Sequence, residues 1–342
     1  MKTTINDIAR AANVAKSTVS KVLNDAPTIS EATKAKVRAI MKELQYTPSS
    51  IATQLAKQSS MNIGFIMNFD RKDDFLNPFF YSLLGGAESV TFEHRYELTI
   101  ANITNSNEDF MNRYVYSKKL DGMLINPSFL NRDVVSELER LEFPYVIVGQ
   151  PKEDYGADSD WVDIDNNEGG RIAANHLLEQ GYARIAFLGG VPGEAISRNR
   201  LAGYQNVMSG ARRDLVSDNP YIRQGETNEA TGYRLMNELL DLDAPPDAVI
   251  CVNNFIAFGV LKAAQERGVR IPEQLGIVTF DNFPLAPYTT PALTALEIDT
   301  FSLGVLATNV LFGKLGLIQA ADAELRSIKP ELIVRQSSLR NG

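Results

Sequence analysis

Apolar residues near the N-terminus recur three and four positions apart, which is the spacing of one face of a helix. The three sets are Ile5, Ile8, Ala9 and Ala12; Val19, Val22 and Leu23; and Val37, Ile40, Met41 and Leu44. Thr4 and Ser30 stand where a side chain caps a helix start, and Asn13 stands at a sharp turn that suits its left-handed preference. The pattern predicts two short helices across a tight turn, braced by a third, which is a helix-turn-helix arrangement.

From residue 62 onward, short apolar runs alternate with helical stretches. The runs are NIGFIMNF at 62–69, LTIA at 98–101, GMLIN at 122–126, YVIVG at 145–149, RIAFLGG at 184–190, AVICVNN at 248–254 and LGIVTFDN at 275–282. Runs this apolar are typical of strands buried on both faces, as in parallel sheets with helical crossovers. We therefore predict two doubly wound α/β lobes, each with a parallel sheet, and a cleft at the strand ends.

The composition narrows the class of protein. A chain of 342 residues with 44% hydrophobic and 22% charged residues is typical of a globular protein with two or three domains. No run of eighteen apolar residues exists, and MKTTINDIARAANV at the N-terminus lacks an apolar signal core. Cys251 is the only cysteine, so an intramolecular disulfide is excluded. We expect a cytoplasmic protein without a membrane segment.

The charge of the chain is unevenly distributed. Residues 1–60 hold nine basic and four acidic residues, a charge of +5, which against the chain total of −8 leaves −13 for the remainder. A basic head on an acidic body suits a protein whose head meets phosphates. A solvated basic face is the plainer interpretation, and the fold of the segment decides between them.

The second predicted helix carries candidate DNA-contacting residues. In a helix-turn-helix, the start of the second helix meets base edges in the major groove. Those positions are Ala15, Lys16, Ser17 and Thr18, followed by Ser20, Lys21 and Asn24. All but Ala15 are polar, which favours DNA binding. Spacing alone leaves open a three-helix bundle that uses this surface for protein contacts.

The segment YTPSSIATQLAKQSS at 46–60 has the composition of a hinge. Pro48 ends the third helix, and Ile51, Ala52, Leu55 and Ala56 form a short amphipathic strip. A helix of under ten residues is marginal in water, so this one needs a partner such as its twin in a dimer and a DNA minor groove. Without DNA, a flexible linker is the alternative interpretation.

INDIARAANVAKSTVSKVLN, followed by ELQYTPSSIATQLA, resembles the headpiece and hinge of the LacI/GalR family of bacterial transcription regulators. The resemblance implies that Lys16, Ser17 and Lys21 read operator bases, and that Leu55 enters the minor groove with Ala52 beside it. Ala15 and Asn13 depart from the family, which commonly has Ser and Gly there. The expected DNA-contacting set is Thr4, Lys16, Ser17, Thr18, Ser20, Lys21, Asn24, Ala52 and Leu55.

Polar residues end several of the predicted strands, where ligands bind in doubly wound folds. They are Asn126, Asn253, Asn254, Asp281 and Asn282, and Arg200 opens the helix after RIAFLGG. The resemblance extends over essentially the whole chain and implies an effector domain similar to periplasmic sugar-binding proteins. It implies that the effector site contains Asn126, Arg200, Asn253 and Asp281; Phe79, Trp161 and Phe283 are candidate aromatic covers. Helix caps and core aromatics are the plainer alternatives for any one of them.

The expected organisation follows the family. The ranges are a headpiece at 1–47, a hinge at 48–60 and an effector and dimerisation domain at 61–342, with an N-lobe at 61–160 and 291–325 and a C-lobe at 161–290 and 326–342. The chain is then expected to cross between lobes near 161, 290 and 325. A two-fold, pseudo-palindromic operator requires a two-fold protein, so we expect a homodimer on double-stranded DNA.

The effector is expected to be a sugar. GQPKEDYGADSDWVDIDNNEGG at 149–170 and TFDNFPLAPYTTPALTALEID at 279–299 resemble regulators of maltose or maltodextrin use, and Gly149 stands where other sugar regulators have an acid. One alternative is a regulator of this family that answers a phosphorylated carrier protein. A two-lobed α/β enzyme or a sugar-binding protein is the rival of another class.

Enzyme chemistry finds no support in the motifs. The chain has no G-x-S-x-G, P-loop or HExxH sequence. His94 and His176 lie in helical stretches without an acid or cysteine at metal-ligand spacing, so packing roles are expected for both. We predict a regulator that binds DNA and a small-molecule effector and that has no catalytic residue, metal or cofactor.

Overall fold

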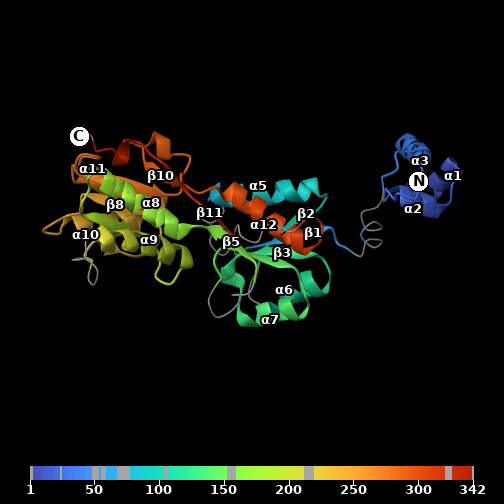
Figure 1. Cartoon of the computed structure of the whole chain (residues 1–342), viewed down its shortest axis with the longest axis horizontal. Helices are drawn as coiled ribbons and strands as arrows, with labels where there is room; N and C mark the ends of the chain where they lie inside the picture. The colour runs from blue at the N-terminus through green and yellow to red at the C-terminus, as the bar shows by residue number, and fades with distance from the viewer. Residues whose placement is uncertain are drawn as a thin grey trace. The chain divides into compact units, whose positions relative to one another are not determined.

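A computed structural model of the chain describes residues 3–23, 25–47, 54, 59–67, 78–102, 107–151, 159–211, 219–319 and 326–340. It divides into two compact units, Met1–Met61 and Asn62–Gly342 (Figure 1). We call the first unit the head. The expected DNA contacts of Asn24, Ala52 and Leu55 lie outside the described residues.

The head contains the three predicted helices, α1 Ile5–Ala12, α2 Lys16–Leu23 and α3 Glu31–Glu43. Their buried core is Ile8, Ala9, Ala12, Val19, Val22 and Val37. Thr4 caps α1 in a reciprocal box, in which Thr4 Oγ1 accepts from the Asp7 amide at 3.4 Å and the Asp7 carboxylate accepts from the Thr4 amide at 3.0 Å. Asn13 ends α1 with a φ of 50°, the left-handed conformation expected of the turn.

Leu44 departs from the prediction that it faces the head core. It is 37% exposed, because α3 ends at Glu43 and Leu44 is its C-cap residue. Tyr46 packs against the core two residues later. The apolar spacing therefore predicts a third helix that is one residue longer than α3.

The larger unit holds two sheets, and the first defines the N-lobe. Within the described residues its strand order is β11-β5-β4-β3-β1-β2, and all neighbours are parallel. The strands are β1 Asn62–Met67, β2 Glu97–Asn102, β3 Gly122–Ile125, β4 Tyr145–Val148, β5 Trp161–Ile164 and β11 Ser327–Ile328. Alternate strand residues face opposite cores, as with Phe65 in one and Ile66 in the other.

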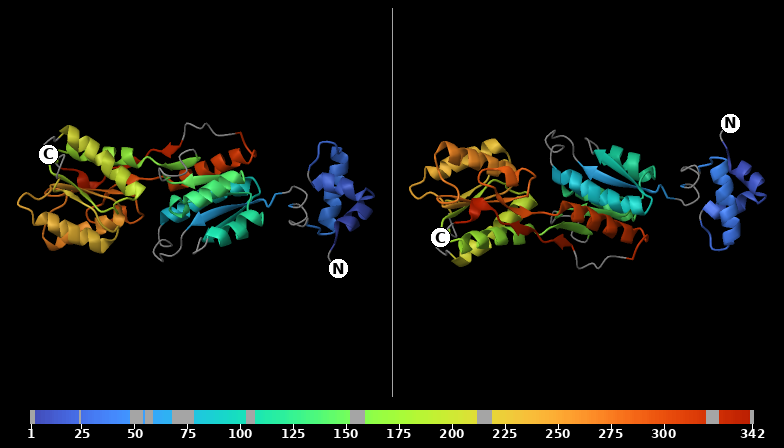
Figure 2. Two further views of the ribbon diagram at one scale, coloured as in Figure 1. Left: turned by 90° about the horizontal axis from the view of Figure 1, so that it is seen from below. Right: turned by 90° about the horizontal axis from the view of Figure 1, so that it is seen from above.

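Helices cover both faces of the N-lobe sheet (Figures 1 and 2). On one face α5 Pro78–Glu93 packs against α12 Thr300–Lys314. On the other lie α6 Asn107–Phe110, a π-helical turn at Met111–Tyr116 and α7 Arg132–Arg140. Phe65 and Ile66 therefore both meet apolar helix faces, which explains the unbroken apolar run in β1.

The second sheet defines the C-lobe, with the order β12-β10-β9-β8-β6-β7 among the described residues. Its strands are β6 Ile185–Leu188, β7 Ile222–Arg223, β8 Ala248–Cys251, β9 Gly276–Phe280, β10 Thr294–Glu297 and β12 Glu331–Ile333. The sheet is parallel except for β12, which pairs with β10 antiparallel. The helix pairs α8 Asn166–Glu179 with α9 Ala195–Ala211, and α10 Glu229–Leu240 with α11 Asn254–Glu266, complete the lobe.

The chain passes between the two sheets three times in the described part of the structure, as the family resemblance implied. The passages follow Ile164 and Glu297 and join β11 to β12, several residues later than the predicted positions of 161, 290 and 325. The first two were placed early because β5 pairs with β4, and β10 with β9, before the chain leaves each sheet. Residues 161–164 and 327–328 therefore belong to the N-lobe, and residues 291–297 to the C-lobe.

Both histidines pack inside the larger unit, as predicted. His176 Nε2 lies 2.7 Å from Ser338 Oγ, and the His94 ring meets Phe312 edge-on with centroids 5.1 Å apart. In the portion of the chain that is described, no three His, Cys, Asp or Glu residues gather as a metal site would require. None of the described helices is long and apolar enough to span a membrane.

Candidate functional site

A cavity of about 370 Å³ lies where the strand ends of both lobes meet. Its polar lining residues are Asn126, Asp163, Asn166, Glu194, Ser197, Arg200, Thr227, Asn253, Asp281 and Thr300. Its apolar ones are Met67, Phe79, Phe80, Leu83, Val148, Ile164, Ile196, Val252, Ile298 and Leu303, with Gly149 beside them. The cavity thus has the size and mixed chemistry of a small-molecule site.

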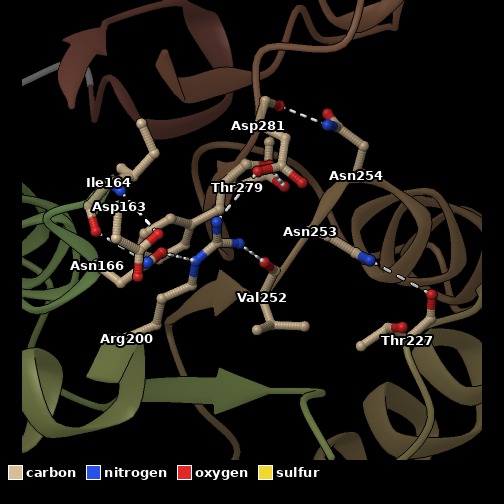
Figure 3. Close-up of polar contacts among 11 residues, drawn as sticks. Asp163, Ile164, Asn166, Arg200, Thr227, Val252, Asn253, Asn254, Thr279 and Asp281 are labelled. Carbon is tan, nitrogen blue, oxygen red and sulfur yellow. Dashed lines mark hydrogen bonds and ion pairs between the residues drawn. The ribbon is translucent and has the colours of Figure 1, made fainter. Parts of the chain in front are cut away.

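Arg200, on α9, organises the polar side of the cavity and is only 5% exposed. Its Nε donates to Asn166 Oδ1 at 2.9 Å, its Nη1 to the Val252 carbonyl at 2.5 Å and its Nη2 to Asp281 Oδ1 at 3.3 Å (Figure 3). The guanidinium also stacks on Phe280, with its carbon 4.1 Å from the ring centroid. The ends of β8 and β9 and the start of α8 are therefore fixed around one cation.

Asp281 follows β9 in the left-handed conformation, with a φ of 64°. Burial raises the pKa of its carboxyl, and the neighbouring Arg200 opposes that rise. The Asn254 side-chain amide donates to the Asp281 carbonyl and so holds the strand end from α11 (Figure 3). The ion pair and this hydrogen bond together position an acceptor at the cavity.

Asp163, on β5, is a buried carboxylate that sequence reasoning missed. It is 7% exposed, and its Oδ1 accepts from the Ile164 amide at 2.8 Å. Burial raises the pKa of its carboxyl to about 6, against the opposing effects of backbone donors at Ile164 and Gln150 and of the Arg200 charge. The signal was the run WVDI, in which one acid stands among apolar residues and which forms β5.

Asn126 and Asn253 line the cavity and also cap helical turns. Asn126 Oδ1 accepts from the Ser128 amide at 2.9 Å, and Asn253 Oδ1 accepts from the Ile256 amide at 3.0 Å. Asn253 Nδ2 donates to the Thr227 carbonyl at 3.3 Å. Each of these two residues is therefore both a cap of a helical turn and part of the cavity lining.

The predicted aromatic residues separate into two groups. Phe79, on α5, lines the cavity. Trp161 packs against the N-lobe core, and Phe283 packs on Phe255 and Phe258, with ring centroids 6.3 Å and 6.1 Å apart. Neither Trp161 nor Phe283 is among the residues that line this cavity. Effector contact by these two stays a prediction without geometric support.

Sequence reasoning also missed Asn166, Glu194, Ser197 and Thr227, which line the cavity. Asn166 begins α8 directly after β5, and Ser197 lies one helical turn before Arg200. Asn166 was missed because the end of β5 was not recognised in the sequence, and Glu194 and Ser197 lie several residues beyond the end of β6. The one signal for Ser197 is its position three residues before Arg200, which places both side chains on the same face of α9.

The head presents the start of α2 as a polar surface. Lys16, Ser17 and Lys21 are exposed, and Thr18 and Ser20 are half-buried. Thr4 is exposed, but its hydroxyl donates to Asp7 Oδ2 at 2.7 Å and accepts from the Asp7 amide, so its role in the head is that of a cap. The geometry brings the five α2 residues together on one short helix.

A helix-turn-helix head joined to a two-lobed α/β unit with a central cavity defines a class of bacterial regulators. Residues 4–49 match the description "Bacterial regulatory proteins, lacI family", and residues 174–338 match "Periplasmic binding protein-like domain". The chain is 30% identical to the HTH-type transcriptional repressor PurR of Aliivibrio salmonicida (strain LFI1238), over 98% of each chain. The chain therefore belongs to the lacI family and is a DNA-binding transcriptional regulator, related to repressors rather than to enzymes.

Solved structures agree with this assignment. A transcriptional regulator CelR–cellobiose complex matches with a TM-score of 0.71 and 26% identity, over 98% of this chain and 100% of that one. The lac repressor dimer bound to operator and the anti-inducer ONPF matches with a TM-score of 0.78 and 23% identity, over 99% and 100%, which shows the shared fold. The maltose-type branch expected from sequence stays a prediction.

Proposed function

We propose that this chain is a repressor that binds a pseudo-palindromic operator as a homodimer, and that a sugar in the cavity changes its operator affinity. The observation that carries the effector proposal is the Arg200 network facing an apolar wall. A sugar ring has hydroxyls at its edge and an apolar face, so it fits a cavity that offers carboxylate and amide groups on one side and Phe79 on the other. Likeness to a cellobiose complex supports the same class.

A purine base is the second candidate effector. The PurR name of the curated relatives favours it, and a planar base would also stack on Phe79 while its edge meets Asn126 or Asp281. A sugar and a base differ in the number of hydroxyl donors that they bring. Direct binding measurements therefore distinguish the two effectors. If neither a sugar nor a base binds, control by a phosphorylated carrier protein is favoured instead.

For DNA, we propose that α2 enters the major groove with Lys16, Ser17 and Lys21 at base edges and phosphates. Their exposure on one short helix supports this arrangement. The proposed minor-groove contact of Leu55, with Ala52 beside it, rests on the family resemblance. If the hinge contributes in this way, Leu55→Gly weakens binding to the specific operator far more than binding to random DNA.

Exposed apolar side chains support a dimer. Tyr288 is 82% exposed and Leu285 is 54% exposed on the C-lobe, and Tyr81 and Phe92 are exposed on α5 of the N-lobe. Exposed apolar residues on both lobes suit association with a second copy. Sedimentation of the full chain at micromolar concentration tests the dimer, and a monomer at that concentration would contradict it.

The experiment that tests the proposed function has two stages. Selection from a random-sequence duplex pool gives the operator, and its affinity is measured at physiological ionic strength for wild type and Leu55→Gly. Calorimetry with maltose, maltotriose, trehalose, glucose, guanine and hypoxanthine then gives the effector class. Selection of a two-fold site and heat from a sugar support the proposal. A protein that selects no sequence, or that binds only a base, contradicts its DNA part or its sugar part respectively.

A further inference from the structure

The cavity carries an excess of negative groups. Among the described residues, three carboxylates line it, those of Asp163, Glu194 and Asp281, against one guanidinium, that of Arg200. Each Arg200 nitrogen already donates within the protein, to Asn166, the Val252 carbonyl and Asp281. These bonds use three of the five N–H groups of the guanidinium, and an anion that reaches the other two also meets the carboxylates of the lining. The lining therefore disfavours phosphate or carboxylate groups on a ligand.

Asp163 is the one of the three carboxylates that is buried without an ion pair. Glu194 is exposed, and Asp281 pairs with Arg200 at 3.3 Å. In the described ranges, the partners of the Asp163 carboxylate are the backbone amides of Ile164 and Gln150. A carboxylate has about four acceptor positions, so two amides leave it able to accept from a ligand at the cavity.

The neighbouring strand leaves room beside Asp163. The Gly149 amide donates to the Val162 carbonyl at 2.8 Å, which continues the β4–β5 pairing and sets Gly149 next to Asp163. Both residues line the cavity, and Gly149 has no side chain to cover the carboxylate. Asp163 is thus a buried acceptor that a ligand can reach.

We propose that Asp163 selects the charge of the effector: the cavity takes an uncharged or cationic molecule that donates a hydrogen bond to Asp163, and it rejects the phosphorylated form of the same molecule. This inference rests on the proposed effector cavity and adds the residue that determines its specificity. A hydrogen bond to an ionised acceptor is stronger than one between neutral groups, and removing its charge weakens binding about tenfold or more. A phosphate at the same distance is repelled.

The charge state of Asp163 links effector binding to pH. Burial raises the pKa of its carboxyl to about 6, and a bound donor favours the ionised form, so affinity falls as pH drops below about 6. The other charged groups that face this region are Arg200 and Glu194 from the α9 side, Asp165 at the start of α8, and Asp281 after β9. Asp281 also has a raised pKa because it is buried, so the Asp163 contribution must be isolated by mutation.

The test uses the full-length chain and ligands in matched charge series. The series are glucose, glucosamine and glucose 6-phosphate; maltose and maltose 6-phosphate; and guanosine with guanosine monophosphate. Thermal stabilisation screens each series, and calorimetry at pH 7.5 and 5.0 gives Kd for any ligand that binds. The proteins are wild type, Asp163→Asn, which keeps the side-chain shape, and Glu238→Gln, the control that removes a carboxylate on α10 outside the cavity lining.

We expect one unphosphorylated ligand to bind and its phosphate ester to bind at least about tenfold more weakly. Asp163→Asn should raise the Kd of that ligand about tenfold at pH 7.5 and remove the further weakening at pH 5.0, while Glu238→Gln changes Kd less than about threefold.

Equal binding of the phosphate ester, or wild-type Kd and pH dependence in Asp163→Asn, would overturn the charge-selection proposal and leave the effector cavity standing. Failure of every ligand in all series would instead overturn the proposed small-molecule control, and this inference with it. If circular dichroism shows that Asp163→Asn is unfolded, the wild-type pH profile decides: affinity that is flat between pH 7.5 and 5.0 overturns the proposal.

Discussion

The two walls of the cavity are built on different principles. The N-lobe contributes mainly apolar side chains, those of Met67, Phe79, Phe80, Leu83, Val148 and Leu303. The C-lobe contributes mainly polar ones, and most of these are already hydrogen-bonded within the protein. We call these the apolar wall and the polar wall.

The difference shows which wall stabilises the protein and which serves the ligand. The polar wall contains a buried cation and carboxylate that must be paired, so its residues are part of the fold as well as of the site. An aromatic ring on the apolar wall faces the cavity, so replacing it with a smaller side chain costs the protein without ligand little folding free energy. Substitutions in the polar wall should therefore change both stability and binding, and those in the apolar wall should change binding with smaller effects on stability.

The largest effect is expected for Arg200→Ala. The substitution leaves Asp281 buried without its cation, which costs about 3–5 kcal/mol of folding free energy, and it removes the effector response. Urea denaturation and calorimetry measure the two losses. The control is Arg171→Ala, which breaks the half-exposed pair with Glu168 and should cost less than about 1 kcal/mol. Equal costs for the two variants would contradict the distinction between the walls.

Asp163→Asn should make the folded protein more stable at neutral pH. Its carboxyl pKa is raised from 3.8 to about 6 by folding, so the ionised group destabilises the native state by about 3 kcal/mol above pH 6. That cost decreases as pH falls through 6 and disappears below 3.8, where both the folded and the unfolded state hold the proton. Urea midpoints at pH 7.5 and pH 4 should show a clear gain at the first and at most a small one at the second; a gain that is independent of pH would show that burial of charge is not the cause.

Phe79→Ala tests the apolar wall. We expect effector affinity to fall by about 1–2 kcal/mol, or roughly tenfold, because a ring face that covers the ligand is lost. Stability should change by less than it does in Arg200→Ala. Phe283→Ala is the matched aromatic control, since Phe283 packs on Phe255 and Phe258 outside the cavity lining. Weaker binding in Phe283→Ala than in Phe79→Ala would reverse the assignment of the aromatic cover.

The smallest expected effect belongs to a hydrogen bond between the lobes. Asn199 Nδ2, on α9, donates to Gln150 Oε1 after β4 at 2.6 Å. A double-mutant cycle with Gln150→Ala and Asn199→Ala should give a coupling of about 1 kcal/mol in effector binding or in stability. A coupling indistinguishable from zero in both would show that this contact does not hold the two walls together.

The sequence predicted local structure well and the cavity partly. Helical spacing and the Thr4 cap are local signals, so the head helices followed from them, and buried strands such as β1 and β8 stood out as apolar runs. Arg200 and Asp281 were found because strand ends and the family resemblance both pointed to them. Their mutual ion pair could not be predicted, because it joins segments 81 residues apart.

Asp163 illustrates why the remainder was missed. Its strand is only four residues long and carries an acid among apolar residues, so the first passage between lobes was placed at 161 and the end of the strand was overlooked. The aromatic predictions failed to separate Phe79 from Trp161 and Phe283 for a related reason: an aromatic side chain looks the same in sequence whether it faces a core or a cavity. The packing of the neighbouring helices decides whether the ring lies in a core or faces the cavity.

Operator binding with and without effector tests the central claim, that occupancy of this cavity controls a DNA-binding head. Fluorescence anisotropy of the full chain would be measured on the selected palindromic duplex and on a random duplex at physiological ionic strength. The account predicts about 1,000-fold or greater preference for the palindrome. It also predicts a change of about tenfold or more in operator Kd when the effector is added, and this change should be weaker in Phe79→Ala at the same effector concentration. Equal binding to both duplexes, or an operator Kd unaltered by a ligand that calorimetry shows to be bound, would contradict it.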